Sequence, residues 1–466
     1  MPSPAPSTSL PSRDAARPIG FWTAYAIVVA NMIGVGVFST LSFQVHALPS
    51  PFVILILWTL GGIVALCGAL AYAELVAALP RSGGEYHLLG RLYGKPVGFV
   101  AGVISLTAGF AAPIAAAAIA FEAYLAKLTP AASTWPGLAA SAAIVALAAL
   151  HMLRVELGAK AQVVMTLLKL LLITGLILAG ASHLAGPAVG FAPQSGDAAL
   201  LVSGAFAVSL VYVSYAYAGW NAAVYVASET VDVSRVLPKA LLAGTATVTL
   251  LYLLVNAVFL AVVPMDQLLA VNPFTAGDQG LVEGELAVAF LAGGALFGAD
   301  GARVIGALVA LGLLSTISAM VLAGPRVAST MAEDYPRTLG WLKLTPGRAP
   351  VVAVAMQAAL ALLLLWTATF AQVIAYIGLL LSSCALLVAA GVIWLRWREP
   401  ELARPFRCWG YPVTPAIFIA VDGWMIVHTA MAQPLSLAFS LATIALGLLG
   451  WWGLARAPGA ESAPAR

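Results

Sequence analysis

Long apolar runs, separated by short polar breaks, extend over almost the whole of this 466-residue chain. Apolar residues make up 62% of the sequence and charged residues only 9%, whereas a soluble domain has about 25% charged residues. A helix of about 20 apolar residues covers the hydrocarbon core of a bilayer. Because backbone polar groups in lipid must be paired within their own segment, such runs predict helices. The sequence therefore predicts an all-α polytopic membrane protein, and the net charge of +3 gives no indication of a nucleic acid partner.

The polar breaks predict twelve spans. We place them at residues 20–44, 51–79, 97–126, 136–153, 159–184, 199–228, 237–264, 300–325, 349–368, 371–396, 412–432 and 434–455. One integral membrane domain would then cover residues 19–456. Residues 1–18 are rich in Pro, Ser and Ala and lack the apolar segment of a signal peptide, so we expect a disordered cytoplasmic tail there. Residues 457–466 form a matching C-terminal tail.

The basic residues predict the orientation, because cytoplasmic loops are enriched in Lys and Arg. With the N-terminus inside, 19 of the 22 basic residues fall on the inner side. The outer side keeps only Lys127 and Arg303, and Lys169 lies within a span. We therefore expect a multi-pass protein of the inner (plasma) membrane with both termini in the cytoplasm.

Two glycines, Gly34 and Gly36, interrupt the first span at its centre. Glycine costs about 1 kcal/mol relative to alanine inside a helix, so the backbone leaves the helix most easily at this point. An opened backbone in lipid persists only where protein, water or a ligand satisfies its polar groups, which favours a binding site at mid-membrane. Small residues at this spacing also occur where spanning helices pack closely. This stretch alone leaves both interpretations open.

A second interruption lies at the centre of the sixth span, where residues 213–221 mix small residues, tyrosines and an asparagine. Interrupted helices at corresponding places in two successive five-helix halves indicate an inverted-repeat transporter. Together the two interruptions favour the binding-site interpretation of Gly34 and Gly36.

Several motifs resemble, in this order and spacing, those of the amino acid–polyamine–organocation superfamily. They lie at residues 31–38, 71–75, 80–86, 215–221, 324–326, 404–407 and 411–415. Within the superfamily, the chain is most similar to the L-type amino acid transporter branch and to bacterial amino acid permeases. The resemblance implies a fold of the leucine-transporter type, in which spans one and six are broken. Residues 20–184 and 199–396 would form a five-plus-five inverted repeat, and residues 412–455 two peripheral helices.

The resemblance also implies alternating access to a site between spans one, three, six, eight and ten. The implied substrate-binding residues are Ile33, Gly34, Val35, Gly36, Tyr215, Ala216, Tyr217, Ala218 and Asn221. Backbone amides of the first break would hold a substrate carboxylate, since free N–H groups at a helix N-terminus favour anions. Carbonyls of the second break would hold the α-amino group, and Tyr215 matches a gating aromatic. Many relatives carry Ser at the position of Val35, so carboxylate recognition would rest here on the backbone alone.

Lys169 lies within the fifth span, where an ammonium group is costly and normally faces a partner or a wet cavity. It matches a family lysine that reaches toward span one and takes the place of sodium in sodium-coupled relatives. The resemblance therefore implies that Lys169 is the coupling residue of sodium-independent transport. The alternative is a lysine whose head group extends to the inner surface.

The acidic residues bear on the charge of the substrate. No Asp or Glu lies at the predicted depth of the two breaks, and Asp422, in span eleven, is expected to pair locally or at a subunit contact. The acids expected near span ends are Glu74, Glu85, Glu122, Glu156 and Glu229. A cationic substrate would require a buried carboxylate. The sequence thus favours a secondary transporter of neutral L-amino acids, working by exchange or proton coupling. The alternatives are a polyamine or cationic amino acid antiporter and a membrane-embedded amino acid sensor.

Other chemistries lack support in the sequence. Three cysteines predict no disulfide framework, the five histidines show no zinc-ligand spacing, and no phosphate-binding glycine loop indicates ATP hydrolysis. We therefore expect no enzymatic activity, no metal and no cofactor. The expected partners are an amino acid, the bilayer and a proton or counter-substrate, with the protein a monomer or homodimer.

Overall fold

The computed structural model describes residues 19–34, 36–129, 135–153, 155–185, 191–270, 288–343 and 350–456. Within these ranges the regular secondary structure is helical, apart from one isolated backbone bridge between Ile19 and Thr230. Nine of the described helices are long and apolar enough to cross a membrane, and three shorter apolar helices accompany them. The prediction of an all-α polytopic membrane protein is confirmed.

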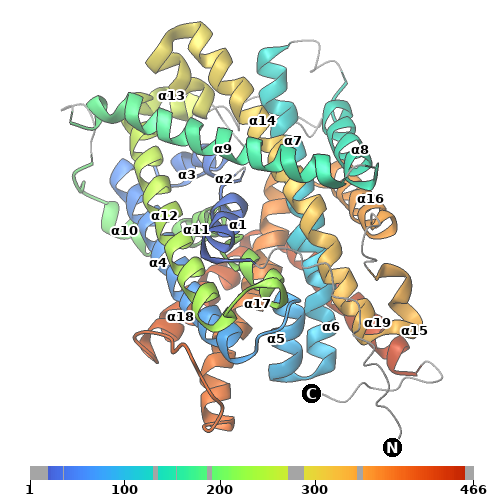
Figure 1. The fold of residues 1–466 in the computed structure, drawn as a ribbon. Helices are drawn as coiled ribbons and strands as arrows, with labels where there is room; N and C mark the ends of the chain where they lie inside the picture. Colours follow the sequence, from blue (N-terminus) through green and yellow to red (C-terminus); the bar gives the residue numbers. More distant parts are fainter. Residues whose placement is uncertain are drawn as a thin grey trace, which may run out of the picture.

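Several described helices match predicted spans within a few residues, as α4 matches 51–79, while the number of twelve spans stays a prediction. The first half contains α1 (Phe21–Met32), α2 (Gly36–Ser39), α3 (Leu41–Ala47), α4 (Pro51–Ala78), α5 (Gly84–Tyr93), α6 (Lys95–Ile104), η1 (Ser105–Ala111), α7 (Ala112–Leu128), α8 (Leu138–Leu153), α9 (Val155–Gly180) and η3 (Ala181–Ala185). The second half contains α10 (Asp197–Leu201), α11 (Gly204–Tyr217), η4 (Trp220–Glu229), α12 (Val233–Val262), α13 (Met265–Ala270), α14 (Val288–Asp334), α15 (Pro336–Leu339), η5 (Gly340–Leu342), α16 (Val351–Thr367), α17 (Phe370–Arg398), α18 (Val413–Ala432) and α19 (Pro434–Arg456). The short helices α1, α2 and α11 lie at the centre of the bundle, with α4 and α12 on one side and α7 and α14 on the other (Figure 1).

Two spans differ from the regular helices that hydropathy predicts. The eighth, expected at 300–325, is the longer helix α14, which changes direction at Gly298, where φ is 73°. Only glycine adopts such a φ readily, and the backbone at this residue is not helical, so α14 consists of two helical segments that meet at Gly298. The third span contains the π-helical segment η1 between α6 and α7. Such segments interrupt α-helices frequently at functional sites.

Side-chain caps fix where two of the long helices begin. The Oγ atom of Ser50 accepts a hydrogen bond from the Val53 N–H at 3.3 Å, and Pro51 occupies the first turn of α4. Thr369 and Gln372 form a reciprocal capping box at the start of α17. These caps satisfy N–H groups that have no partner inside the helix. The local sequence therefore predicts where each of the two helices begins.

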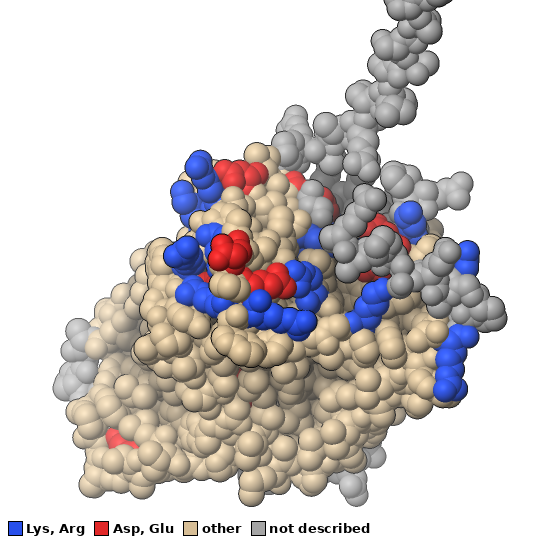
Figure 2. All heavy atoms as spheres, turned by 90° about the horizontal axis from the view of Figure 1, so that it is seen from below, with Lys and Arg blue, Asp and Glu red and all other residues tan. Residues whose placement is uncertain are grey.

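Lys and Arg side chains gather on one face of the molecule, which Figure 2 shows from below, together with several acidic side chains. Salt bridges cross between elements at this end: Arg81 pairs with Asp334 at 2.6 Å, and Arg91 with Glu399 at 2.8 Å. The Arg91 guanidinium lowers the pKa of the Glu399 carboxyl through its hydrogen bonds to that group. The pairs connect the α4–α5 segment to the ends of α14 and α17.

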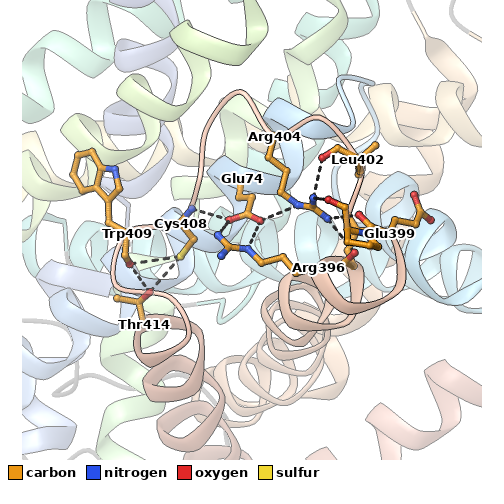
Figure 3. A network of polar contacts seen from close by, with 10 residues as sticks. Glu74, Arg396, Glu399, Leu402, Arg404, Cys408, Trp409 and Thr414 are labelled. Carbon is orange, nitrogen blue, oxygen red and sulfur yellow. Dashed lines mark hydrogen bonds and ion pairs between the residues drawn. The ribbon is translucent and has the colours of Figure 1, made fainter.

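Glu74, near the end of α4, is the centre of a buried ion-pair network (Figure 3). Its side chain is only 2% exposed, and Arg396 donates two hydrogen bonds to its carboxylate at 2.8 and 2.6 Å. The Arg404 Nε lies 3.5 Å from the same carboxylate, and the Cys408 N–H donates to it at 2.7 Å. The network therefore connects α4 to the end of α17 and to the loop that follows it.

Arg404 also caps the C-terminal end of α17. Its guanidinium donates to the carbonyls of Leu395, Glu399, Pro400 and Leu402 at 2.8–3.2 Å. Carbonyls at a helix end lack partners within the helix, so an arginine there satisfies them and complements the helix dipole. The motifs at 71–75 and 404–407 thus meet at one point of the fold.

Substitution Glu74→Ala should destabilise the protein. It leaves the Arg396 and Arg404 guanidinium groups without their carboxylate, and removing one partner of a buried ion pair costs about 3–5 kcal/mol. We expect the apparent melting temperature in detergent to fall by several degrees. The matched control is Glu333→Ala, since Glu333 is exposed. Equal melting temperatures for the two variants would contradict the stabilising role of the network.

Candidate functional site

The first helix break lies where the glycines predict it. α1 ends at Met32 and α2 begins at Gly36, and Ile33 between them has an extended backbone with φ −75° and ψ 91°. The carbonyls at the end of α1 accept from other helices: Met32 O from the Tyr252 hydroxyl at 2.6 Å and Ile33 O from Lys169 Nζ at 3.0 Å. The break is therefore stabilised by side chains of α12 and α9.

The second break follows α11, which ends at Tyr217. Ala218 is extended, with φ −57° and ψ 150°, and Gly219 is left-handed, with φ 103°. The chain then continues as the 3₁₀-helical segment η4. The helical ladder is interrupted at 218–219, at the centre of the predicted sixth span.

The two breaks lie against each other. A Cβ atom at Gly36 would lie only 2.5 Å from the Ala216 Cα, and one at Gly219 would lie 2.7 Å from the Asn31 carbonyl oxygen. The close-packing interpretation therefore holds for Gly36 but not for Gly34, where a Cβ would lie 3.8 Å from the nearest side-chain atom, an ordinary contact distance. Both glycines also line a cavity.

The cavity at the breaks has a volume of about 460 Å³. It is lined by segments of spans one, three, five, six, eight and ten. The lining includes Gly34, Gly36, Gly109, Phe110, Pro113, Thr166, Leu170, Tyr215, Ala216, Ala218, Gly219, Asn221, Tyr225, Thr316, Met320, Arg326, Ile377 and Leu381. Gly109 and Phe110 belong to η1, which places the π-helical segment at the cavity wall.

The structure brings together most of the residues that the resemblance implied. Of these, the cavity wall contains Gly34, Gly36, Tyr215, Ala216, Ala218 and Asn221. Ile33 and Tyr217 are not in the wall. Tyr217 is only 1% exposed, its ring packs beside Trp58 and Tyr252, and its hydroxyl donates to Trp58 O at 3.2 Å. Val35 lies outside the described residues.

Lys169 lies beside the cavity and is only 3% exposed. Besides Ile33 O, its Nζ donates to the Thr316 Oγ1 at 3.0 Å, and Thr316 lines the cavity. Its head group thus reaches the first break and α14 instead of extending to the inner surface. No salt bridge to Lys169 occurs in the part of the chain that the structure describes.

The sequence did not single out three features of this site. Glu85, expected only at a span end, is buried and accepts hydrogen bonds from the cavity residues Asn221 and Tyr225. Arg326 lines the cavity and lies 3.9 Å from Glu229. The π-helical segment η1 has no compositional signature. The glycine pair directly before Glu85 is the one sequence feature that could have indicated its place in a packed turn.

A sequence profile described as "Amino acid permease" matches residues 19–451. The chain belongs to the amino acid permease family. The permease is 27% identical over 443 residues to "Large neutral amino acids transporter small subunit 2" of Mus musculus, covering 93% of this chain and 80% of that protein. It is 26% identical over 446 residues to "Asc-type amino acid transporter 1" of Mus musculus, at 93% and 80% coverage.

A bacterial relative is covered over a larger share of its own length. The permease is 24% identical over 448 residues to "Serine/threonine exchanger SteT" of Bacillus subtilis (strain 168), covering 94% of this chain and 97% of that protein. The family and these relatives are membrane transporters, which confirms the resemblance inferred from the motifs. At the level of the family, the chain is a transporter and not an enzyme.

Substitution Gly36→Ala should separate the two breaks. The added methyl group would overlap the backbone at Ala216, and overpacking of this kind costs about 1–3 kcal/mol. We expect a lower apparent melting temperature in detergent. Gly175→Ala is the matched control, because a Cβ there meets nothing within 4 Å. A Gly36→Ala variant as stable as the control would contradict the close approach of α2 and α11.

Proposed function

We propose that this permease moves neutral L-amino acids across the inner membrane by alternating access, as a sodium-independent exchanger or a proton-coupled carrier. The observation that carries the proposal is the cavity where two broken helices meet. None of the described residues in its wall is acidic. A zwitterion with an uncharged side chain needs no buried carboxylate, whereas a polyamine does. The names of the relatives, which refer to neutral amino acids, support the same class.

We infer that the nine long helices, together with α8, α11 and α16, make twelve spans. Residues 20–184 and 199–396 would be inverted repeats, each opening with a broken helix, and 412–455 the peripheral pair. Both tails, at 1–18 and 457–466, would be cytoplasmic. The gathering of basic side chains on one face (Figure 2) supports this orientation.

The two breaks would hold the two ends of the substrate. Backbone amides between Gly34 and Gly36 would face its carboxylate. The Ile33 N–H, which the resemblance also implied, already donates to Val29 O at 3.1 Å at the end of α1, so Ile33 is not proposed as a donor to the substrate. Carbonyls between Tyr215 and Ala218 would accept from its ammonium group. Tyr215 would close over the bound substrate as a gate, since this residue lies in the cavity wall.

Exchange in proteoliposomes tests the function. Vesicles loaded with a neutral amino acid should take up labelled leucine, alanine or serine, with the same rate when sodium is omitted. Labelled arginine and putrescine should remain outside. A second set of vesicles, with a pH gradient and no internal amino acid, separates proton coupling from exchange. Selective uptake of putrescine would favour the polyamine antiporter, and binding without flux would favour the sensor.

Substitution Lys169→Ala should reduce the exchange rate at least tenfold. Without its ammonium group, the Ile33 carbonyl and Thr316 lose a donor at the first break, and an unsatisfied buried carbonyl costs about 1–3 kcal/mol. Lys127→Ala is the matched control, because Lys127 is exposed at the end of α7. Both variants should elute as folded protein in size-exclusion chromatography. Undiminished exchange by Lys169→Ala would remove Lys169 from the mechanism.

A further inference from the structure

Glu85 carries a buried carboxylate for which the proposed function has given no role. It lies in the first turn of α5 and is only 3% exposed. Its Oε1 accepts from the Tyr72 hydroxyl at 2.9 Å and from the Asn221 Nδ2, and its Oε2 accepts from the Tyr225 hydroxyl. Neutral donors surround this carboxylate, and no salt bridge to it occurs among the described residues. The positive end of the α5 dipole also favours a negative charge here.

Two of the three donors line the substrate cavity. Asn221 and Tyr225 both belong to η4, the segment that follows the break in span six, and both contribute to the cavity wall. Tyr72 comes from α4 and is buried outside that wall. Glu85 is therefore one side chain away from the cavity, on an element that does not itself line it.

The backbone before Glu85 is shaped to receive Tyr225. Gly84 has φ 55°, and a Cβ there would overlap the Tyr225 ring. The Phe110 ring of η1 packs edge-on against the same tyrosine, with centroids 5.7 Å apart. Gly84 and Glu85 thus contact the tyrosine ring and its hydroxyl, respectively, which explains this part of the motif at 80–86.

The chemistry of the carboxylate determines how Asn221 is turned. The Asn221 Nδ2 donates to the Glu85 Oε1, and this contact fixes the orientation of the amide, because its other end has no hydrogen to donate. Its Oδ1 then remains as an acceptor at the half-buried cavity wall. An acceptor that is shielded from water is stabilised when it receives a donor. A bound amino acid brings such donors in its ammonium group or in a side-chain hydroxyl.

We propose that Glu85 is a positioning residue for the substrate site: it orients Asn221 and Tyr225 so that the Asn221 Oδ1 accepts a hydrogen bond from the bound amino acid. This inference rests on the proposed function and adds a residue that touches no substrate. Through Glu85, α5 would then contribute to substrate binding indirectly, by its contacts with η4.

The test is a set of substitutions that moves the carboxylate between the two residues. In Glu85→Gln, the amide offers donors as well as an acceptor, so Asn221 is no longer held in one orientation. In Asn221→Asp, two carboxylates face each other. Each single variant should bind labelled neutral amino acid about tenfold more weakly, the effect expected for loss of one charge-assisted hydrogen bond.

The double variant, Glu85→Gln with Asn221→Asp, exchanges the two functional groups. The new amide at position 85 can donate to the new carboxylate at position 221, which restores the contact with its polarity reversed. Because the two residues act through one shared interaction, their effects should not add. Binding should therefore recover to within about threefold of the unaltered protein.

Binding is measured on purified protein in detergent, by displacement of the labelled amino acid found active in the exchange assay. Melting temperature is recorded in parallel. A purely structural role for Glu85 predicts that both single variants melt lower and that the losses add in the double variant. Recovery of affinity in the double variant supports the positioning role. Glu333→Gln, at an exposed glutamate, should bind like the unaltered protein.

The outcomes separate this inference from the function on which it rests. If the unaltered protein exchanges neutral amino acids and Glu85→Gln binds them equally well, the positioning role is overturned and the proposed function stands. Additive losses of affinity in the double variant overturn it as well. If the unaltered protein exchanges no amino acid at all, the proposed function and the positioning role are both contradicted.

Discussion

Every other part of the structure depends on the requirement that backbone polar groups inside a membrane have partners. A helix that stops in mid-bilayer leaves carbonyls without donors, and each such group costs several kcal/mol in lipid. Here the end of α1 is stabilised by the Tyr252 hydroxyl and the Lys169 ammonium, from α12 and α9. The break therefore depends on α12, which packs against α1, and on the Lys169 side chain, which reaches the end of α1 from α9. The central cavity is one result of that arrangement.

The segment that connects α4 to α5 joins several parts of the fold near the face where the basic side chains gather. Glu74 before it faces α17 and its loop, Arg81 within it pairs with Asp334 of α14, and Glu85 after it holds η4. Glu74 and Glu85 are buried and have hydrogen-bond partners, as burial demands, whereas the Arg81–Asp334 pair is partly exposed. The end of α4, the loop and the start of α5 thus contact three separate regions of the bundle.

The fold was predictable from the sequence to the extent that it depends on hydropathy and local backbone preference. Spans such as 51–79 match α4 within a residue or two, and the break at Gly34 follows from the low helix propensity of glycine. The π-helical segment η1 was not predictable, because its residues are ordinary for a spanning helix.

The candidate site was predictable only in part. Which face of α11 meets the cavity depends on packing against other helices, so Tyr215 lines it and Tyr217 does not. The contacts of Glu85 with Asn221 and Tyr225 join residues more than 130 positions apart, and no local pattern encodes them.

The backbone bridge at the start of α1 has a mechanical consequence. The Ile19 N–H donates to Glu229 O at 2.9 Å, and the Val231 N–H donates to Ile19 O at 3.0 Å, so the entry to span one is tied to the exit of span six. Neither half-helix can tilt outward alone without rupturing both bonds. A displacement of either one is transmitted to the other, so the two halves of the site move in step at this end.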